Sequence, residues 1–251
     1  MAFLTRWDED QSRPAFRSAL RDLAVRAVLP AIALFGVIVA FGYVLKGPLL
    51  ELSEDEKEIN RDLQAARDDL WNSITNLMSM IGNTEYVIGV CVVVVGLVWW
   101  RTKQWWYAVV PGIAISLQAT VFVTATHVVG RTRPTVERLD PTPPTSSFPS
   151  GHVGASTALY ATFALMATRI DNPLVRRLTI TWCVLAPAFV TGARLYRGAH
   201  HVTDVVFGIL NGVVCAVLAW LYLRRRSAAE VQADSSADTA DAADATGQTR
   251  A

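Results

Sequence analysis

The sequence predicts an all-α membrane protein, built as a bundle of six transmembrane helices. Of its 251 residues, 52% are hydrophobic and 18% are charged, which is an apolar balance for a soluble protein. Six apolar runs of about 15–25 residues come near the ~20 residues that a helix needs to cross ~30 Å of hydrocarbon. A buried sheet in a soluble protein is the alternative, and six such runs are too many for it. The runs cover residues 28–45, 86–100, 105–129, 153–168, 178–193 and 202–223.

The runs are predicted to be helices because a chain in lipid must satisfy its backbone polar groups internally. This requirement should outweigh the strand propensity of the second run, which contains VCVVVVGLVWW. The three cysteines lie far apart inside apolar runs and form no CxxC pair, so we interpret them as small core side chains rather than disulfide or metal sites. A net charge of +1 gives no indication of a nucleic-acid partner.

Lysine and arginine residues predict the orientation of the bundle. They recur before the first run, in the RTKQ connection between the second and third runs, between the fourth and fifth runs, and after the sixth. With six spans these segments share one side, which the positive-inside rule identifies as cytoplasmic. We therefore expect a cytoplasmic segment at 1–27, a domain at 28–226 in the plasma (bacterial inner) membrane, and a disordered cytoplasmic tail at 227–251, which is rich in Ala, Asp, Ser and Thr.

The long connection at 46–85 is predicted to form an extracytoplasmic amphipathic helix. Its apolar residues recur with a helical period, Ser53 or a neighbour could be the N-cap, and acidic residues follow in the first turn. Two interpretations stay open. The segment is either a solvated helix packed over the bundle or an interfacial helix that shapes the access of lipids.

Three polar clusters lie on the predicted outer side, each at the end of an apolar run. They are RTRP at 131–134, PSGH at 149–152 and ARLYRGAHHVTD at 193–204. Arginines on the side that the positive-inside rule disfavours suggest an anionic ligand. Because the runs end at one face of the bundle, we expect the three clusters to converge there.

The residue types in these clusters fit phosphoryl transfer. Arginine forks match phosphate oxygens, and Ser150 and Gly151 would begin the fourth helix, where free N–H groups favour an anion. His200 and Asp204 lie four residues apart and share a helix face, so the carboxylate can fix the imidazole tautomer and leave the other nitrogen to attack phosphorus. His152 could then protonate the leaving oxygen.

This order of motifs, R-P, then P-S-G-H, then R-x5-H-x3-D, resembles the type 2 phosphatidic acid phosphatase superfamily of membrane lipid phosphate phosphatases. The resemblance covers the third to sixth runs. It implies a haloperoxidase-like helical core, no metal and no other cofactor, and a phosphohistidine at His200 oriented by Asp204. It makes His152 the general acid that afterwards activates water. The residues implied to hold the phosphate are Arg133, Arg194, Ser150 and Gly151.

Two positions depart from the patterns K-x6-R-P and S-R-x5-H-x3-D of that superfamily. The serine before Arg194 is Ala193, a mild change because the residue stays small. The lysine position is Thr126, which removes one phosphate-binding cation. His127 and Arg131 are candidate replacements. Since a helix turns His127 about 100° away from the preceding position, Arg131 is the preferred one.

The sequence thus predicts a membrane enzyme that hydrolyses a lipid phosphate or diphosphate at the outer face. The substrates suggested by the resemblance are undecaprenyl diphosphate, which is the first choice, phosphatidic acid and phosphatidylglycerol phosphate. Two alternatives stay open: a phosphotransferase that passes the phosphoryl group from His200 to an alcohol, and a catalytically silent membrane binding protein, suggested by Thr126. A vanadate haloperoxidase is disfavoured because the site would lie among lipid-spanning helices.

Overall fold

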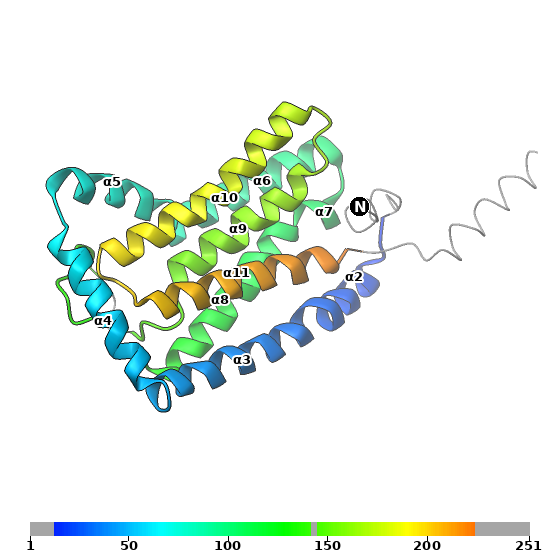
Figure 1. Cartoon of the computed structure of the whole chain (residues 1–251). Coiled ribbons are helices and arrows are strands. Elements are labelled where there is room, and N and C mark those ends of the chain that lie inside the picture. Colours follow the sequence, from blue (N-terminus) through cyan, green and yellow to red (C-terminus); the bar gives the residue numbers. More distant parts are fainter. Residues whose placement is uncertain (1–12, 142–144, 224–251) are drawn as a thin grey trace, which may run out of the picture.

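The structure, a computed structural model, describes residues 13–141 and 145–223. Long helices lie side by side, and two shorter helices cross one end of them (Figure 1). The described residues contain no strand, which confirms the all-α prediction. All six apolar runs form helices, at Leu29–Lys46 (α3), Thr84–Thr102 (α6), Val110–Val129 (α8), Gly151–Ala167 (α9), Pro173–Tyr196 (α10) and Val202–Leu221 (α11).

Two of these helices have additional helical residues before them. α3 follows without interruption from Phe16–Leu23 (α2) and a π-helical turn at Ala24–Val28 (η1). A four-residue helix, Trp105–Ala108 (α7), precedes α8. Residues 16–27 of the expected cytoplasmic segment at 1–27 are therefore helical and continue directly into α3. Residues 1–12 of that segment and the tail predicted at 227–251 lie outside the described residues.

Local signals in the sequence account for several helix ends. Asn172 caps α10, because its Oδ1 accepts hydrogen bonds from the N–H groups of Leu174 and Val175 at 3.0 and 3.2 Å. Pro173 occupies the first helical position, where its missing N–H costs no intrahelical bond. α8 ends at Gly130, whose φ of +60° is a conformation that glycine adopts without steric cost.

Five helical segments are long and apolar enough to cross a membrane, by length and composition, and the 17-residue α9 is just shorter. α9 packs against α8, α10 and α11 and is largely buried among them. A Cβ atom on Gly212 of α11 would lie 2.6 Å from the carbonyl oxygen of Gly154 in α9, so glycine is what allows this close approach. The predicted six-helix bundle is thus present, with a short helix at its centre.

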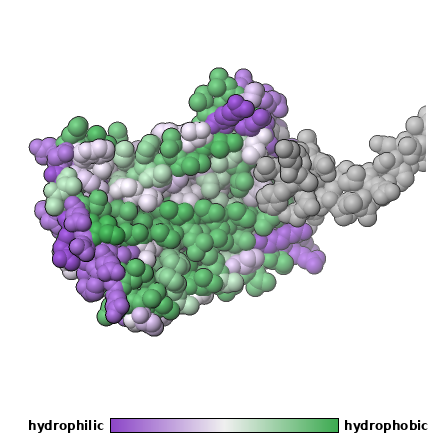
Figure 2. Space-filling view, viewed as in Figure 1, coloured by the Kyte–Doolittle hydropathy of each residue, from purple (hydrophilic) through white to green (hydrophobic). Residues whose placement is uncertain are grey.

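The surface of the bundle has the polarity of a membrane protein. Hydrophobic side chains cover the middle of the face shown in Figure 2, and hydrophilic ones gather towards both ends. Large apolar side chains point outward, among them Val92 and Leu178, which are 65% and 62% exposed. A soluble protein rarely exposes apolar surface of this extent, whereas helices in lipid require it.

The segment at 46–85 differs from its prediction, because it forms two helices and not one. They are Leu50–Ala65 (α4) and Asp69–Met80 (α5), so the first helix starts before Ser53. Asp68 interrupts the segment, since its Oδ1 accepts a hydrogen bond from the N–H of Trp71 at 2.8 Å and thereby caps α5. Both helices lie across the end of the bundle that is far from α2 (Figure 1).

The first and last described helices meet at the other end of the bundle. Ala19 of α2 belongs to the same core cluster as Trp220, Tyr222 and Leu223 at the end of the described chain. The connections α6–α7 and α9–α10 also lie at this end (Figure 1). The four basic segments that predict the orientation are all attached to this end. Arg224, Arg225 and Arg226 of the last segment lie outside the described residues.

Candidate active site

The three polar clusters meet at the end covered by α4 and α5, as the sequence predicted. The loop after α8 returns on itself through a hydrogen bond from Ser147 N–H to the Arg131 carbonyl, at 2.9 Å. It then joins the third cluster, since Ser150 N–H donates to the Asp204 carbonyl, also at 2.9 Å. These backbone contacts place the beginning of α9 beside the beginning of α11.

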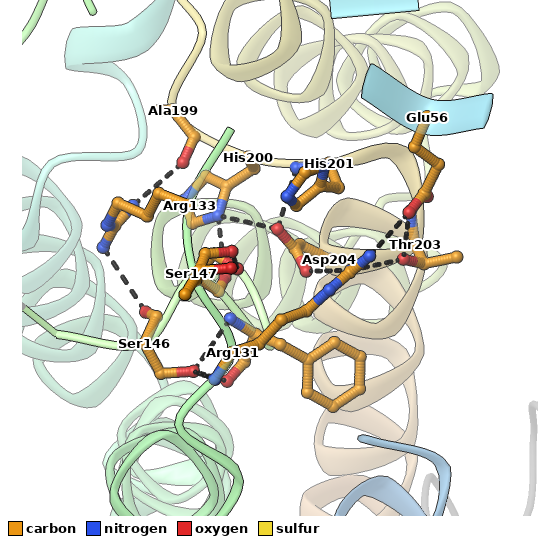
Figure 3. Close-up of polar contacts among 12 residues, drawn as sticks. Glu56, Arg131, Arg133, Ser146, Ser147, Ala199, His200, His201, Thr203 and Asp204 are labelled. Atoms are coloured by element: carbon orange, nitrogen blue, oxygen red, sulfur yellow. Dashed lines mark hydrogen bonds and ion pairs between the residues drawn. The ribbon is translucent and has the colours of Figure 1, made fainter. Parts of the chain in front are cut away.

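His200 lies in the loop between α10 and α11, and its ring lines a cavity. Its Nδ1 is 2.8 Å from the carbonyl oxygen of Ser147 and 3.7 Å from Oδ2 of Asp204. A proton on Nδ1 is therefore donated to the Ser147 carbonyl, which leaves the Nε2 lone pair available. The sequence predicted Asp204 as the orienting group, whereas the carbonyl of Ser147 is the nearer one (Figure 3). A backbone acceptor carries no sequence signal.

The protonation state of His200 suits a nucleophile. Burial lowers the pKa of its imidazole below the ordinary value, and the carboxylate of Asp204 opposes this shift. The positive charges of Arg194 and Arg133 lower the pKa further, and the net direction is downward. The ring is therefore neutral at pH 7, and only a neutral imidazole offers a lone pair.

Asp204 is fully buried at the beginning of α11 and does not reach the cavity. Its Oδ2 accepts a hydrogen bond from His201 N–H at 2.8 Å, which closes the first turn of the helix. Its Oδ1 accepts one from Nη1 of Arg131 at 2.6 Å. Asp204 can thus orient His200 but cannot touch a ligand in the cavity.

His152 faces the same cavity from the first turn of α9. Its Nε2 lies 3.0 Å from Oδ1 of Asn83, the residue that precedes α6. This contact with Asn83 was not predicted, because it joins two segments that are 69 residues apart. An asparagine directly before an apolar run was the only sequence signal.

Two arginines also line the cavity. Nη1 of Arg133 donates to the carbonyl of Ala199 at 2.9 Å, and Nη1 of Arg194 donates to Ser79 at 3.1 Å and to Asp140 at 2.7 Å. In the described part of the chain, the Nε groups of both arginines are buried without a hydrogen-bond partner. The two guanidinium groups at the cavity provide positive charge for an anionic ligand.

Asp140 is an acidic residue of the site that the sequence analysis missed. Its carboxylate bridges Arg194 and Arg197, with a distance of 2.6 Å to Nη2 of Arg197, and it lines the cavity. Although burial raises the pKa of Asp140, the hydrogen bond from Arg197 and the charges of Arg194 and Arg197 outweigh it and hold that pKa below its ordinary value. Asp140 thus gives Arg194 a counter-charge when no ligand is bound.

The cavity measures about 750 Å³ and is polar at one end and apolar at the other. The apolar end lies between α6 and α8, where Ile88 and Phe122 line it. A second cavity of about 780 Å³ shares Ile88, Ile115 and Ser116 with the first and continues along the same two helices. A polar group bound near the histidines would therefore have a continuous apolar track beside it.

The family model of the PAP2 superfamily matches residues 105–228, a stretch that contains all three polar clusters. The chain belongs to the PAP2 superfamily. Among solved structures, it is similar to a transmembrane PAP2-type phosphatidylglycerolphosphate phosphatase from Bacillus subtilis, with a TM-score of 0.66 and 18% sequence identity. That similarity covers 76% of this chain and 94% of the Bacillus chain.

LpxE from Aquifex aeolicus is a second similar structure, with a TM-score of 0.52 and 18% identity over 65% of this chain and 93% of that one. At such identities the likeness shows a common fold. No curated protein matches the sequence. The described residues of this PAP2 protein contain no group of three or more His, Cys, Asp or Glu side chains that could hold a metal ion.

Three of the predicted site residues lie elsewhere in this PAP2 protein. Thr126 is buried, with its hydroxyl 2.8 Å from the Val123 carbonyl, and His127 is exposed, with Nδ1 2.7 Å from the same oxygen. Ser150 is fully buried, and its hydroxyl has no partner in the described residues and does not line the cavity. Gly151 does line it, and a Cβ there would lie 2.6 Å from the Phe122 ring.

Arg131 does not lie where the sequence predicted. It was predicted to replace the missing lysine at the phosphate, but it does not line the cavity and is only 5% exposed. Its guanidinium instead lies on the far side of Asp204 from His200, between Asp204 and Glu56 (Figure 3). Two buried carboxylates attract this cation more strongly than a solvent-facing site, because a buried charge needs a partner. Arg133 and Arg194 are the cations left at the cavity.

Proposed function

We propose that this PAP2-superfamily protein is a membrane lipid phosphatase that works through a phosphohistidine at His200. The observation that carries the proposal is a single cavity with a polar surface for a phosphate and an apolar surface for a hydrocarbon chain. Its polar end presents His200, His152, Arg133 and Arg194, and its other end is an apolar track between α6 and α8. A phosphate fits the first surface, and the hydrocarbon of a lipid fits the second.

In the first step, Nε2 of His200 attacks phosphorus while the bond from phosphorus to the lipid oxygen breaks. His152 gives its proton to the leaving oxygen, so the lipid departs as an alcohol or as a monophosphate. In the second step, His152 takes a proton from a water molecule whose oxygen attacks the phosphohistidine, which releases inorganic phosphate and restores His200. Arg133 and Arg194 hold the charge that spreads over the phosphoryl oxygens.

For the substrate we place undecaprenyl diphosphate first, because the second cavity extends the apolar track well beyond the site and suits a long hydrocarbon chain. Phosphatidate-type lipids come second. The Bacillus neighbour is described as a phosphatidylglycerolphosphate phosphatase, which supports a glycerolipid monoester. Both substrates present the same phosphoryl chemistry to the two histidines.

The test is phosphate release by the purified protein from a panel of undecaprenyl diphosphate, phosphatidic acid and phosphatidylglycerol phosphate. We expect at least one lipid to be hydrolysed more than about a hundredfold faster than by the His200→Ala variant. Release that is equal in the two proteins for every lipid would exclude the phosphatase and favour a silent binding protein. An added alcohol that receives the phosphoryl group in place of water would instead identify a phosphotransferase.

We further propose that the active site faces the outside of the cytoplasmic membrane and that both termini face the cytoplasm. The basic connections at the end of the bundle near α2 support this orientation. Leu70 and Leu77 of α5, which are both 68% exposed at the opposite end, support placing that helix at the membrane surface.

A cysteine-labelling experiment tests this orientation, because the three native cysteines are buried. Glu58 of α4 and Asp171 between α9 and α10 are both exposed, at opposite ends of the bundle. We expect an impermeant thiol reagent to label Glu58→Cys in intact cells, and Asp171→Cys only after the cells are permeabilised. The reverse pattern would place the active site in the cytoplasm.

A further inference from the structure

A buried cluster of charges lies on the opposite side of His200 from Arg133 (Figure 3), and its residues do not line the cavity. Oε2 of Glu56 is 2.7 Å from Nη2 of Arg131, whose Nη1 is 2.6 Å from Oδ1 of Asp204. The same Nη1 donates to the Thr203 hydroxyl at 2.7 Å. Glu56 comes from α4, the segment inserted between the first two membrane helices, so the insert reaches into the core of the site.

Glu56 also binds the beginning of α11 directly. Its Oε1 accepts a hydrogen bond from the N–H of Thr203, and its Oε2 is 3.1 Å from the Thr203 hydroxyl. A carboxylate at a helix N-terminus satisfies an N–H group that has no partner inside the helix. One turn further along α4, Nδ2 of Asn60 donates to the carbonyl of His200 at 3.2 Å. α4 therefore holds both the nucleophile's loop and the helix that carries Asp204.

The burial of these groups distinguishes them from ordinary surface charges. Glu56, Arg131 and Asp204 are 3%, 5% and 0% exposed, whereas the neighbouring acids Glu54, Asp55 and Glu58 on α4 are exposed. Charges that are excluded from water persist only when they are paired and hydrogen-bonded. Removing Glu56 would leave the Arg131 guanidinium with Asp204 as its one carboxylate partner among the contacts described above.

We propose that Glu56 is a positioning residue of the active site, which acts through Arg131 and the N-terminus of α11 to hold Asp204 and thereby His200. The proposal rests on the proposed function, since it takes His200 as the nucleophile. Glu56, Arg131 and Asp204 together carry a charge of −1 beside a ring that becomes positively charged when phosphorylated. Without Glu56 that local charge is zero, so the phosphohistidine loses electrostatic support.

The other charged groups that face His200 act in the opposite sense. Arg133 and Arg194 bring positive charge from the cavity side, and His152 approaches from α9. Asp204 is the carboxylate nearest to the ring. The position of Asp204 therefore affects how well His200 tolerates a positive charge, and Glu56 holds that position from outside the cavity through Arg131 and Thr203.

The test compares Glu56→Gln and Glu56→Asp with a matched control, Glu58→Gln, which removes an exposed charge from the same helix. We expect Glu56→Gln to lower kcat by about ten- to a hundredfold, the loss typical of a hydrogen bond to a charged group, with KM changed by less than about twofold. Glu56→Asp should restore part of kcat because it restores the charge. The control should match the wild type.

A second measurement does not depend on activity. The chain has four histidines, so the His200 signal can be assigned by NMR with single variants and followed against pH. We expect His200 to titrate at a lower pH in Glu56→Gln than in the wild type, because a negative charge that stabilises the protonated ring is gone. If Glu56 only stabilised the helix, both the His200 titration and kcat of Glu56→Gln would equal those of the wild type. An unchanged titration or an unchanged kcat overturns the proposal.

The two proposals can fail separately. If the wild type released no phosphate from any lipid, the proposed function would fail, and the His200 titration would still decide the role of Glu56. If Glu56→Gln did not fold, Arg131→Lys takes its place, since lysine keeps the charge but lacks the fork that spans both carboxylates. A wild-type kcat and titration in a folded Arg131→Lys would overturn the proposal equally.

Discussion

We expect His200→Ala to abolish turnover, with a fall in kcat of at least about 10⁴-fold, as for other deletions of a nucleophile. The physical reason is that the other imidazole beside Asp204, that of His201, does not line the cavity and so cannot replace His200. His152 belongs to a different helix and pairs with Asn83, 3.0 Å away. The measurement is phosphate release from the preferred lipid under saturating conditions.

Rapid quenching of the reaction tests whether a phosphoprotein forms at His200. A phosphoprotein that is labile in acid and stable in base should form in the wild type and be absent in His200→Ala. An unchanged thermal unfolding temperature would show that the variant keeps its fold. Activity that survives in a folded His200→Ala variant would contradict the covalent mechanism.

For His152→Ala we expect a loss that depends on the leaving group. With a lipid alcohol the leaving oxygen must be protonated, so kcat should fall by about 10²- to 10⁴-fold, the usual contribution of general acid catalysis. With p-nitrophenyl phosphate the leaving phenolate needs little protonation, and formation of the phosphoprotein should be nearly normal. Its hydrolysis should still be slow, because the proposed mechanism also uses His152 to activate water, so the phosphoprotein should accumulate.

The two substrates therefore serve as controls for each other in the His152→Ala variant. Equal losses of the phosphorylation rate with both would show that His152 binds or orients the phosphate and does not act as the acid. Substituting Asn83 should produce a weaker effect of the same kind, since its Oδ1 only holds the His152 ring.

The long apolar helices and several residues of the cavity could be predicted from the sequence because each leaves a local signal. An apolar run must be helical in lipid, and the motifs at 131–134, 149–152 and 193–204 identify the end of the bundle where they converge. His152, His200, Arg133 and Arg194 all line one cavity, as these motifs indicated. Their chemical roles stay predictions.

The partners of these residues could not be predicted, because they come from distant segments or from the backbone. Asp140 and Glu56 pair with arginines 54 and 75 residues away, and neither spacing leaves a pattern in the sequence. Arg131 was misplaced for the same reason. Arg131 was preferred over His127 as the replacement for the lysine missing at Thr126, whereas the buried carboxylates of Glu56 and Asp204 determine where its guanidinium lies. The break at Asp68 was missed because the apolar period continues across it.

The shortness of α9 bears on how deep in a membrane the first turn of that helix can lie. Its 17 residues span only about 25 Å, less than the ~30 Å of hydrocarbon in a typical bilayer. Where its other end is level with the neighbouring helices, we expect the first turn, which carries His152, to lie below the plane of the surrounding lipid headgroups. A phosphate that reaches it must sink and lose much of its hydration before any bond changes, or the bilayer must thin around the protein. We expect the two arginines at the cavity to compensate a bound phosphate for that lost water.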